Sequence, residues 1–331
     1  MTLPADFDPD GPGSGGLFGL PHSLEQARVA VLPVPYEATT SFGQGTAEAP
    51  DAVLEASWQV DLSDPETGEP WRGGIAMDAA PDWLPALATE ARAAADRARD
   101  GDDDALALVN DASARLDAHV ATWTAAQLDA GRIPAILGGD HSVPHGAHRV
   151  VTERFPGIGV LHVDAHADLR HAYEGFSGSH ASIFDNARAL SGLGPVVQVG
   201  IRDQGTAERR AAAEDPRIHQ WTDDAIAMAG GLTPEVAARM VEPLPPAVWI
   251  SFDVDGLDPA LCPGTGTPVP GGLSWREAMI LLRALGTSGR RIVGFDLCEV
   301  GPNAWDANVG ARLLYKLCGW AAFTNPTPER T

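Results

Sequence analysis

Lysine is almost missing from this 331-residue chain: Lys316 stands alone among 23 basic residues, and the other 22 are arginines. Acidic residues number 45, so the net charge is −22 at pH 7. A surface of this sign repels nucleic acid and anionic membranes, and it weakly favours cationic ligands by long-range steering. Salt adaptation or codon bias would leave the same composition, so the charge is compatible with a basic ligand without establishing one.

Cysteines are few, and long apolar runs are absent. Cys262, Cys298 and Cys318 show neither disulfide nor metal-site spacing, which indicates buried thiols in a reducing cytoplasm. No apolar run approaches the roughly 20 residues needed to span a membrane. Residues 1–19 are acidic and rich in glycine and proline, unlike a signal peptide. We therefore expect a cytoplasmic protein without nucleic-acid or membrane partners.

Strand-like and helix-like segments alternate along most of the chain, which predicts an α/β fold with a parallel sheet covered on both faces. We expect an N-terminal arm over residues 1–26, ordered only near 17–20, a single catalytic domain over 27–323 and a tail over 324–331. The segment 61–81 is rich in turn residues and is expected to be a surface loop. Expected strands are 29–34, near 74–77, 133–137, 158–161, 196–200, 247–252 and 291–297. Expected helices are 49–56, 84–99, 105–130, 143–154, near 205–213, 274–285 and near 306–322.

Three of these apolar strands end in acidic residues and histidines. The first is followed by Gly138-Gly139-Asp140-His141, the second by His162-Val163-Asp164-Ala165-His166-Ala167-Asp168, and the third by Ser251-Phe252-Asp253-Val254-Asp255. Residues two apart in an extended strand face the same side, and ligands of open parallel sheets bind beyond the carboxyl ends of the strands. A single Asp after a strand is usually a cap or turn residue, as we expect for Asp140. The repetition at three strand ends instead predicts a metal site with six candidate ligands: His141, Asp164, His166, Asp168, Asp253 and Asp255.

The candidate ligands are four carboxylates and two imidazoles, without a thiolate. Such an oxygen-rich set suits Mn²⁺ or a similar divalent ion better than a structural zinc. Four carboxylates around one ion would leave a negative cluster that is unfavourable to bury, whereas two ions would neutralise them. Two bridged ions would also acidify a shared water at neutral pH. The residues therefore predict a dinuclear hydrolase.

These three motifs, in this order and spacing, resemble the signatures of the ureohydrolase (arginase/agmatinase) family, and the resemblance runs from about Val29 to Trp320. It implies a three-layer α/β/α fold, two Mn²⁺ ions, with Ni²⁺ as an alternative, a trimeric or hexameric homo-oligomer, and hydrolysis of a guanidino group to urea and an amine. Carried over by position, Asp168 would also hold the attacking hydroxide and take its proton. The implied metal pairs are His141 with Asp168 and His166 with Asp255, bridged by Asp164 and Asp253.

Two further positions match the family pattern. His180, in Ser179-His180-Ala181-Ser182, resembles the histidine that passes a proton to the leaving amine, and a titrating imidazole fits that task. Glu299 follows the last strand and resembles the glutamate that pairs with the substrate guanidinium, for which a carboxylate is the natural bidentate partner. The alternatives are a loop histidine bonded to backbone and an ordinary strand-end glutamate. His162 lies deeper in its strand, so we expect it to pack behind the ligands.

The motifs leave the guanidino substrate open. The loop Arg170–Ser179 lacks the groups with which arginases hold an amino-acid carboxylate, and Gly205 stands near their acidic residue for the α-amino group. These departures favour agmatine, which would yield putrescine, over arginine. Trp305 lies soon after Glu299 and would narrow the pocket toward guanidinobutyrate, guanidinopropionate or guanidine. The segment 263–268 is expected to be a rigid loop beneath the site.

Two other classes of protein were weighed. A dinuclear metallophosphoesterase would require a Gly-Asn-His ligand motif and basic residues for phosphate, and neither is present. A non-catalytic metal-binding homologue would be expected to have lost a ligand, His180 or Glu299, and all of them are present. The sequence therefore favours a hydrolase for a small cationic guanidino compound.

Overall fold

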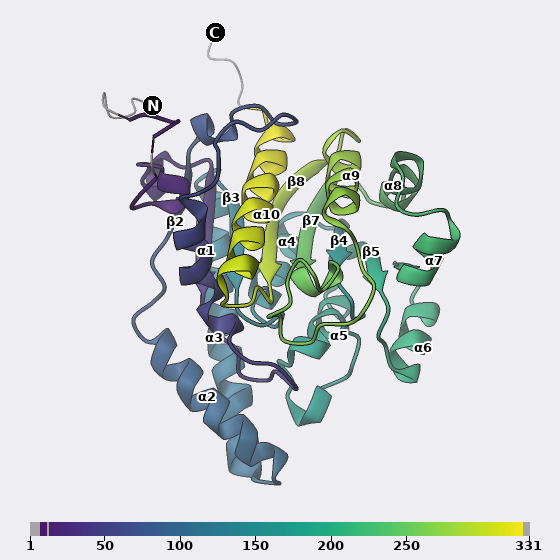
Figure 1. Ribbon diagram of the computed structural model, residues 1–331. Coiled ribbons are helices and arrows are strands. Elements are labelled where there is room, and N and C mark those ends of the chain that lie inside the picture. Colours follow the sequence, from purple (N-terminus) through teal and green to yellow (C-terminus); the bar gives the residue numbers. More distant parts are fainter. Residues whose placement is uncertain (1–6, 12, 327–331) are drawn as a thin grey trace.

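A parallel eight-stranded sheet forms the centre of the computed structural model, which describes residues 7–11 and 13–326 (Figure 1). The strand order is β2-β1-β3-β8-β7-β4-β5-β6, and every neighbouring pair is parallel. The strands are β1 Val29–Val34, β2 Ile75–Met77, β3 Ile133–Gly138, β4 Ile158–Val163, β5 Leu193–Ile201, β6 Ile218–Thr222, β7 Ala247–Asp253 and β8 Arg291–Cys298.

Two layers of helices cover the sheet, and α10 and α9 lie in front of it in Figure 1. No helix in the described part of the chain has the length and apolar character required to cross a bilayer. One hydrophobic cluster joins the sheet to α1, α7, α8, α9 and α10, and the other joins it to α2, α3, α4, α5 and α6. The helices are α1 Ala49–Ser57, α2 Leu84–Arg99, α3 Asp103–Asp129, α4 His145–Arg154, α5 Ile183–Arg188, α6 Thr206–Glu214, α7 Asp223–Met228, α8 Pro234–Val241, α9 Trp275–Gly286 and α10 Ala304–Phe323.

Strand β1 shows why the two layers form. Its six residues are all buried, and successive side chains enter opposite clusters: Val29 and Val31 join the first, whereas Ala30 and Leu32 join the second. A strand buried on both faces has no polar side, which is why it is a continuous apolar run in the sequence. The predicted three-layer α/β/α architecture is confirmed.

The elements that the sequence did not predict are short or lie at the sheet edge. Strand β6 is one of the two edge strands, and its residues Ile218-His219-Gln220-Trp221-Thr222 are only half-buried. Helices α5 and α7 have six residues each, and α8 has eight. Such segments are too short for an apolar period to stand out.

The segment 61–81 is more than the surface loop expected from its turn residues. It contains the predicted short strand, β2, but the side chain of Trp71 is buried. Lys316 of α10 lies 2.5 Å from the Asp64 carboxylate, and the Tyr315 hydroxyl donates to the Leu62 carbonyl at 2.5 Å. The lone lysine thus fastens this segment to the last helix.

The close crossing of α4 and α3 depends on Gly146, because a Cβ there would collide with the backbone oxygen of Asp117. Gly146→Ala should lower the free energy of unfolding by about 2 kcal/mol or more, although alanine favours helix by about 1 kcal/mol. Urea unfolding measures this change. The matched control is Gly310→Ala in α10, where the added Cβ would meet only Val300 methyl groups at 3.0–3.1 Å and a Val53 methyl group at 3.1 Å. Equal losses in both variants would contradict the backbone-clash argument.

Candidate metal centre and substrate cavity

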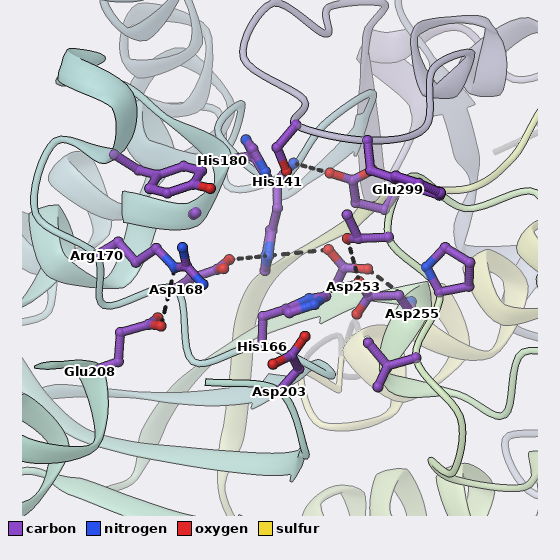
Figure 2. A pocket seen from close by; sticks show the side chains of 17 residues that line it. His141, His166, Asp168, Arg170, His180, Asp203, Glu208, Asp253, Asp255 and Glu299 are labelled. Carbon is purple, nitrogen blue, oxygen red and sulfur yellow. Dashed lines mark hydrogen bonds and ion pairs between the residues drawn. The ribbon is translucent and has the colours of Figure 1, made fainter. Parts of the chain in front are cut away.

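The predicted ligands come together because their strands are neighbours. Strands β3, β8, β7 and β4 lie side by side in the centre of the sheet. The segments that follow them meet at its carboxyl edge, where Figure 2 shows the labelled acidic and histidine side chains around one cavity. Two further segments, the loops after β5 and β1, complete the walls.

The first group of candidate ligands surrounds one nitrogen of His141. Its Nδ1 lies 3.0 Å from Asp164 Oδ2, 3.1 Å from Asp168 Oδ2 and 3.4 Å from Asp253 Oδ2. Each of these four side chains is at least 94 % buried, with exposures of 1, 1, 6 and 4 %. Three carboxylates and an imidazole thus meet at one point of the cavity.

The second group forms around His166. Its Nδ1 lies 3.0 Å from Asp255 Oδ2 and 3.5 Å from Asp164 Oδ1. Asp164 therefore directs one oxygen toward each group, so its carboxylate lies between them. The structure brings together all six residues that the strand ends predict, in two clusters that share a carboxylate.

The pKa shifts in the first group indicate that its carboxylates lack positive charge to neutralise them. Burial, and after it the Asp164 carboxylate, raises the pKa of Asp168 to about 7. Burial and the neighbouring carboxylates of Asp255 and Asp164 raise the pKa of Asp253 well above its usual range. Burial opposes protonation of His141, but the surrounding carboxylates outweigh it and hold the pKa of this ring well above its usual value. Divalent cations compete with protons for such ligands, and the donor set fits them.

Two of the acidic residues have a left-handed backbone conformation, with φ of 54° at Asp168 and 63° at Glu299. This conformation is uncommon for residues other than glycine, and a sparsely populated backbone costs about 1–3 kcal/mol per residue. The surrounding loops hold it in place: the Asp168 carbonyl accepts from the backbone of Phe184 at 3.0 Å, and Glu299 N donates to the Gly139 carbonyl at 2.8 Å. Both carboxylates are thereby turned into the cavity.

Behind the ligands, the side chains of His141, Ser251 and Asp296 form a buried hydrogen-bond relay that the sequence analysis did not predict. His141 Nε2 lies 2.9 Å from Ser251 Oγ, whose hydroxyl donates to Asp296 Oδ1 at 2.8 Å. Because the hydroxyl hydrogen is used on Asp296, His141 must donate from Nε2, and its Nδ1 is the nitrogen that could bind a metal in place of a proton. Trp249 Nε1 donates to the other oxygen of Asp296 at 2.5 Å. Cys298 also lies near, but burial raises the pKa of its thiol well above the usual value.

His162 packs behind the ligands, as expected. Gln198 Nε2 donates both to the Ala167 carbonyl, at 2.8 Å, and to His162 Nδ1, at 3.0 Å. The ring therefore carries its hydrogen on Nε2, which lies 2.8 Å from Asp164 Oδ2. Both ring nitrogens are used, and His162 steadies the shared carboxylate by a hydrogen bond.

Asp140 is bonded to backbone, as a turn residue would be. Its Oδ2 accepts from Ala38 N at 3.1 Å, and its Oδ1 accepts from Ser142 N at 3.0 Å. The turn also requires Gly139, since a Cβ there would collide with the backbone of Tyr36. The Gly-Gly-Asp sequence thus holds the loop after β1 against the loop after β3.

A cavity of about 330 Å³ opens over the two groups. Glu299 reaches into it and is 3 % exposed; its Oε1 accepts from His141 N at 3.1 Å. Its Oε2 is buried and has no hydrogen-bond partner among the described residues. A Cβ on Gly266 would come within 2.9 Å of that oxygen, so the glycine leaves it room. The lining residues are Ser41, Phe42, His141, His166, Asp168, Arg170, Tyr173, His180, Ala181, Asp203, Glu208, Asp253, Asp255, Thr267, Pro268, Val269 and Glu299.

His180 lines the cavity and is neutral at physiological pH. Burial, reinforced by the positive charges of His166, His141 and Arg99, lowers the pKa of the His180 ring to about 3. Its Nδ1 lies 3.2 Å from Thr39 Oγ1. The ring is therefore bonded through one nitrogen to a side chain of the loop after β1.

Three more charged residues line the cavity, and the sequence analysis gave none of them a role. Arg170 Nε donates to Glu208 Oε2 at 3.2 Å, and its guanidinium lies 4.5 Å from the centre of the Tyr173 ring. Glu208 is buried and also accepts from the backbone of Leu169 and Gly205. Asp203 is exposed in the same wall. A capping pattern, Gly205 with Glu208 three residues later, was the available signal for the buried glutamate.

Two expectations about the cavity walls are wrong. Trp305 does not line the cavity: its side chain is 53 % exposed, and its Nε1 donates to the Ala260 carbonyl at 3.0 Å. Its backbone N–H is held by the helix cap, Asn303, whose side chain accepts from Trp305 N and Asp306 N. The loop 263–268, expected to lie beneath the site, instead contributes Thr267 and Pro268 to the lining.

Comparison with known proteins gives consistent results. Residues 27–321 match the arginase family. The chain is 35 % identical over 305 residues to an N(1)-aminopropylagmatine ureohydrolase of Thermus thermophilus, covering 89 % of this chain and 90 % of that one. It is 29 % identical to an agmatinase of Bacillus cereus, covering 87 % and 89 %. The solved structure of an agmatine ureohydrolase of Thermoplasma volcanium superposes with a TM-score of 0.72 at 25 % identity, covering 91 % and 92 %.

Removal of the Asp296 carboxylate should destabilise the protein strongly. Asp296→Ala leaves the buried Trp249 and Ser251 donors without their acceptor, and breaking a buried polar cluster costs about 3–5 kcal/mol. Burial opposes ionisation of Asp296, but the His141 and His148 rings, each 3.6 Å from one of its oxygens, hold the pKa of this carboxyl far below its usual range. Its contribution is therefore complete above the unfolded pKa of about 4 and is lost as pH falls through the folded value.

Urea unfolding in EDTA, at pH 7 and at pH 3.5, measures this contribution apart from metal binding. The difference from wild type should be largest at pH 7 and smaller at pH 3.5. The exposed Asp82→Ala serves as the control and should stay within about 0.5 kcal/mol of wild type. A difference as small as that of the control would show that the buried relay contributes little.

Proposed function

The chain belongs to the arginase family, and on that basis we propose that it is a dinuclear metal hydrolase that cleaves agmatine to putrescine and urea. The observation that carries the proposal is the unpartnered, buried Oε2 of Glu299 beside two clusters of metal-ligand side chains. A buried carboxylate oxygen without a donor is unfavourable, and a planar guanidinium with several N–H groups satisfies it. The family membership and this oxygen point to the same chemical group.

Six residues would hold the metal ions in this proposal. His141 and Asp168 would bind one ion and His166 and Asp255 the other, with Asp164 and Asp253 between them. The support is the placement of Asp164, which lies 3.0 Å from one imidazole and 3.5 Å from the other. When bound, the two ions would lower the pKa of a shared water so that it is a nucleophile at neutral pH. Mn²⁺ suits the mixture of carboxylate and imidazole, and Ni²⁺ is the alternative.

The protein groups would then perform binding and proton transfer. Glu299 would hold the guanidinium with its carbon over the ligand clusters. Asp168 would accept the proton of the attacking water as the C–O bond forms. The His180 ring would relay that proton from Asp168 to the amine nitrogen as the C–N bond breaks. The hydroxyl proton of the new C–O group would follow, so that urea and a protonated amine leave.

The cavity favours a substrate with a cationic tail. The exposed Asp203 carboxylate would meet a second positive charge, and the net charge of −22 steers such a ligand inward. Arg170 is already paired with Glu208 and would offer little to a substrate carboxylate. With Trp305 outside the cavity, the argument for a smaller guanidino compound loses its basis.

The remaining proposals rest on the family and on composition. We propose that the catalytic domain spans residues 27–323, preceded by an arm and followed by a short tail. We further propose that the enzyme works in the cytoplasm as a homo-oligomer, a trimer or hexamer.

The metal assignment predicts that Asp253→Asn loses most bound metal and most activity together, because it removes a charge shared by both ions. Metal content is measured by plasma mass spectrometry after loading with Mn²⁺ and desalting. Asp140→Asn is the matched control: the same change in a neighbouring buried carboxylate that bonds only to protein groups should leave two ions per chain. Two full-occupancy ions in Asp253→Asn would overturn the assignment.

The substrate assignment predicts that L-arginine is at least about tenfold poorer than agmatine in kcat/KM, since the loss of one good polar contact has that effect. Urea release from a panel of guanidino compounds, assayed with Mn²⁺ and with Ni²⁺, tests this. Asp203→Asn should raise KM for agmatine about threefold to tenfold and leave the KM for guanidine, which has no tail, unchanged. Efficient arginine hydrolysis by wild type would refute the substrate assignment but not the dinuclear site.

A further inference from the structure

His180 is held by one residue of a distant loop. Thr39, in the loop after β1, contacts it twice: Thr39 Oγ1 accepts from the backbone N–H of His180 at 3.1 Å and lies 3.2 Å from the ring Nδ1. Thr39 is fully buried. One side chain therefore fixes both where the histidine backbone sits and where its ring points.

The hydroxyl of Thr39 can serve the ring in both of its protonation states. A hydroxyl has one hydrogen to donate and two lone pairs to accept with. One lone pair takes the backbone N–H of His180, and the other accepts Nδ1–H, which the ring carries in both its neutral and its protonated state. The proton that the ring gains and loses is then on Nε2, the nitrogen that does not face Thr39. The ring can thus gain and lose a proton without turning.

Two arginines of α2 hold the loop that carries Thr39. Arg92 Nη1 donates to the Thr40 carbonyl at 3.0 Å and to its hydroxyl at 2.8 Å. Arg99 Nη2 donates to the carbonyls of Thr39 and Thr40, both at 3.1 Å. Arg99 Nε also binds Glu174 at 2.6 Å, and Glu174 lies in the turn shortly before His180. The two loops that meet at the histidine are therefore joined by one guanidinium.

We propose that Thr39 is a positioning residue for His180, whose hydroxyl keeps the imidazole aimed at the leaving nitrogen throughout the proton transfer. This inference rests on the proposed function, in which His180 gives that proton. An ordinary buried threonine would need only one hydrogen-bond partner, whereas this hydroxyl contacts two atoms of the same histidine. Proton transfer depends on placement, and a misplacement of about 1 Å can cost about 100-fold in rate.

A double-mutant cycle on the metal-loaded enzyme separates positioning from general structural support. Thr39→Val has nearly the same shape without the hydroxyl, and Thr39→Ser keeps the hydroxyl. With agmatine, Thr39→Val should lower kcat about 10- to 100-fold, change KM less than about threefold and retain both ions. Thr39→Ser should stay within about threefold of wild type. In a His180→Asn background, Thr39→Val should reduce kcat less than about twofold further.

Equal losses from Thr39→Val in the wild-type and His180→Asn backgrounds would overturn the proposal, as would failure of Thr39→Ser to restore kcat. Thr39→Ala replaces the valine variant if that one does not fold. Crystal structures provide a readout independent of activity: the His180 ring should be turned or disordered in Thr39→Val and unmoved in Thr39→Ser. An unmoved ring in Thr39→Val would also overturn the proposal. If no guanidino compound releases urea, the proposed function fails, and the ring positions alone then decide the role of Thr39.

Discussion

Repulsion among buried carboxylates is the constraint on which the rest of this structure depends. Asp164, Asp168, Asp253, Asp255 and Glu299 gather at one edge of the sheet, and all of them are buried. Two like charges 4 Å apart in surroundings of intermediate polarity repel by about 4 kcal/mol. The backbone holds them there nevertheless, with two of them in the left-handed region. A fold that maintains such a cluster is suited to bind positively charged groups.

Neighbouring side chains offset part of the repulsion among these carboxylates. Histidines lie between the carboxylates, and two of them are oriented from behind: His141 through Ser251 to Asp296, and His162 through Gln198. The one arginine in the described cavity wall, Arg170, is paired with a buried glutamate. The negative potential of the cavity is thus left for a ligand to satisfy.

Sequence patterns could predict the fold and the gathering of the candidate ligands because both follow from local rules. Continuous apolar runs predict buried parallel strands, and Asp and His just after such runs must meet at the carboxyl edge. What the sequence did not predict depends on contacts between distant loops. Thr39 acts on a histidine 141 residues away, and Glu208 meets Arg170 only because the loops after β4 and β5 adjoin. The prediction for Trp305 was wrong because closeness to Glu299 in the sequence does not determine the direction in which the indole side chain points.

The strand order also determines when the sheet can be completed during synthesis on the ribosome. Strand β8, residues 291–298, lies between β3 and β7. Until it emerges, β2-β1-β3 and β7-β4-β5-β6 are separate half-sheets, each with an open, apolar edge that invites pairing with another chain. Between the synthesis of β7 and that of β8 the nascent chain therefore carries two exposed inner edges, and the last strand closes both at once. That same strand delivers Asp296 and leads directly into Glu299, so the site becomes complete at the moment when the edges disappear.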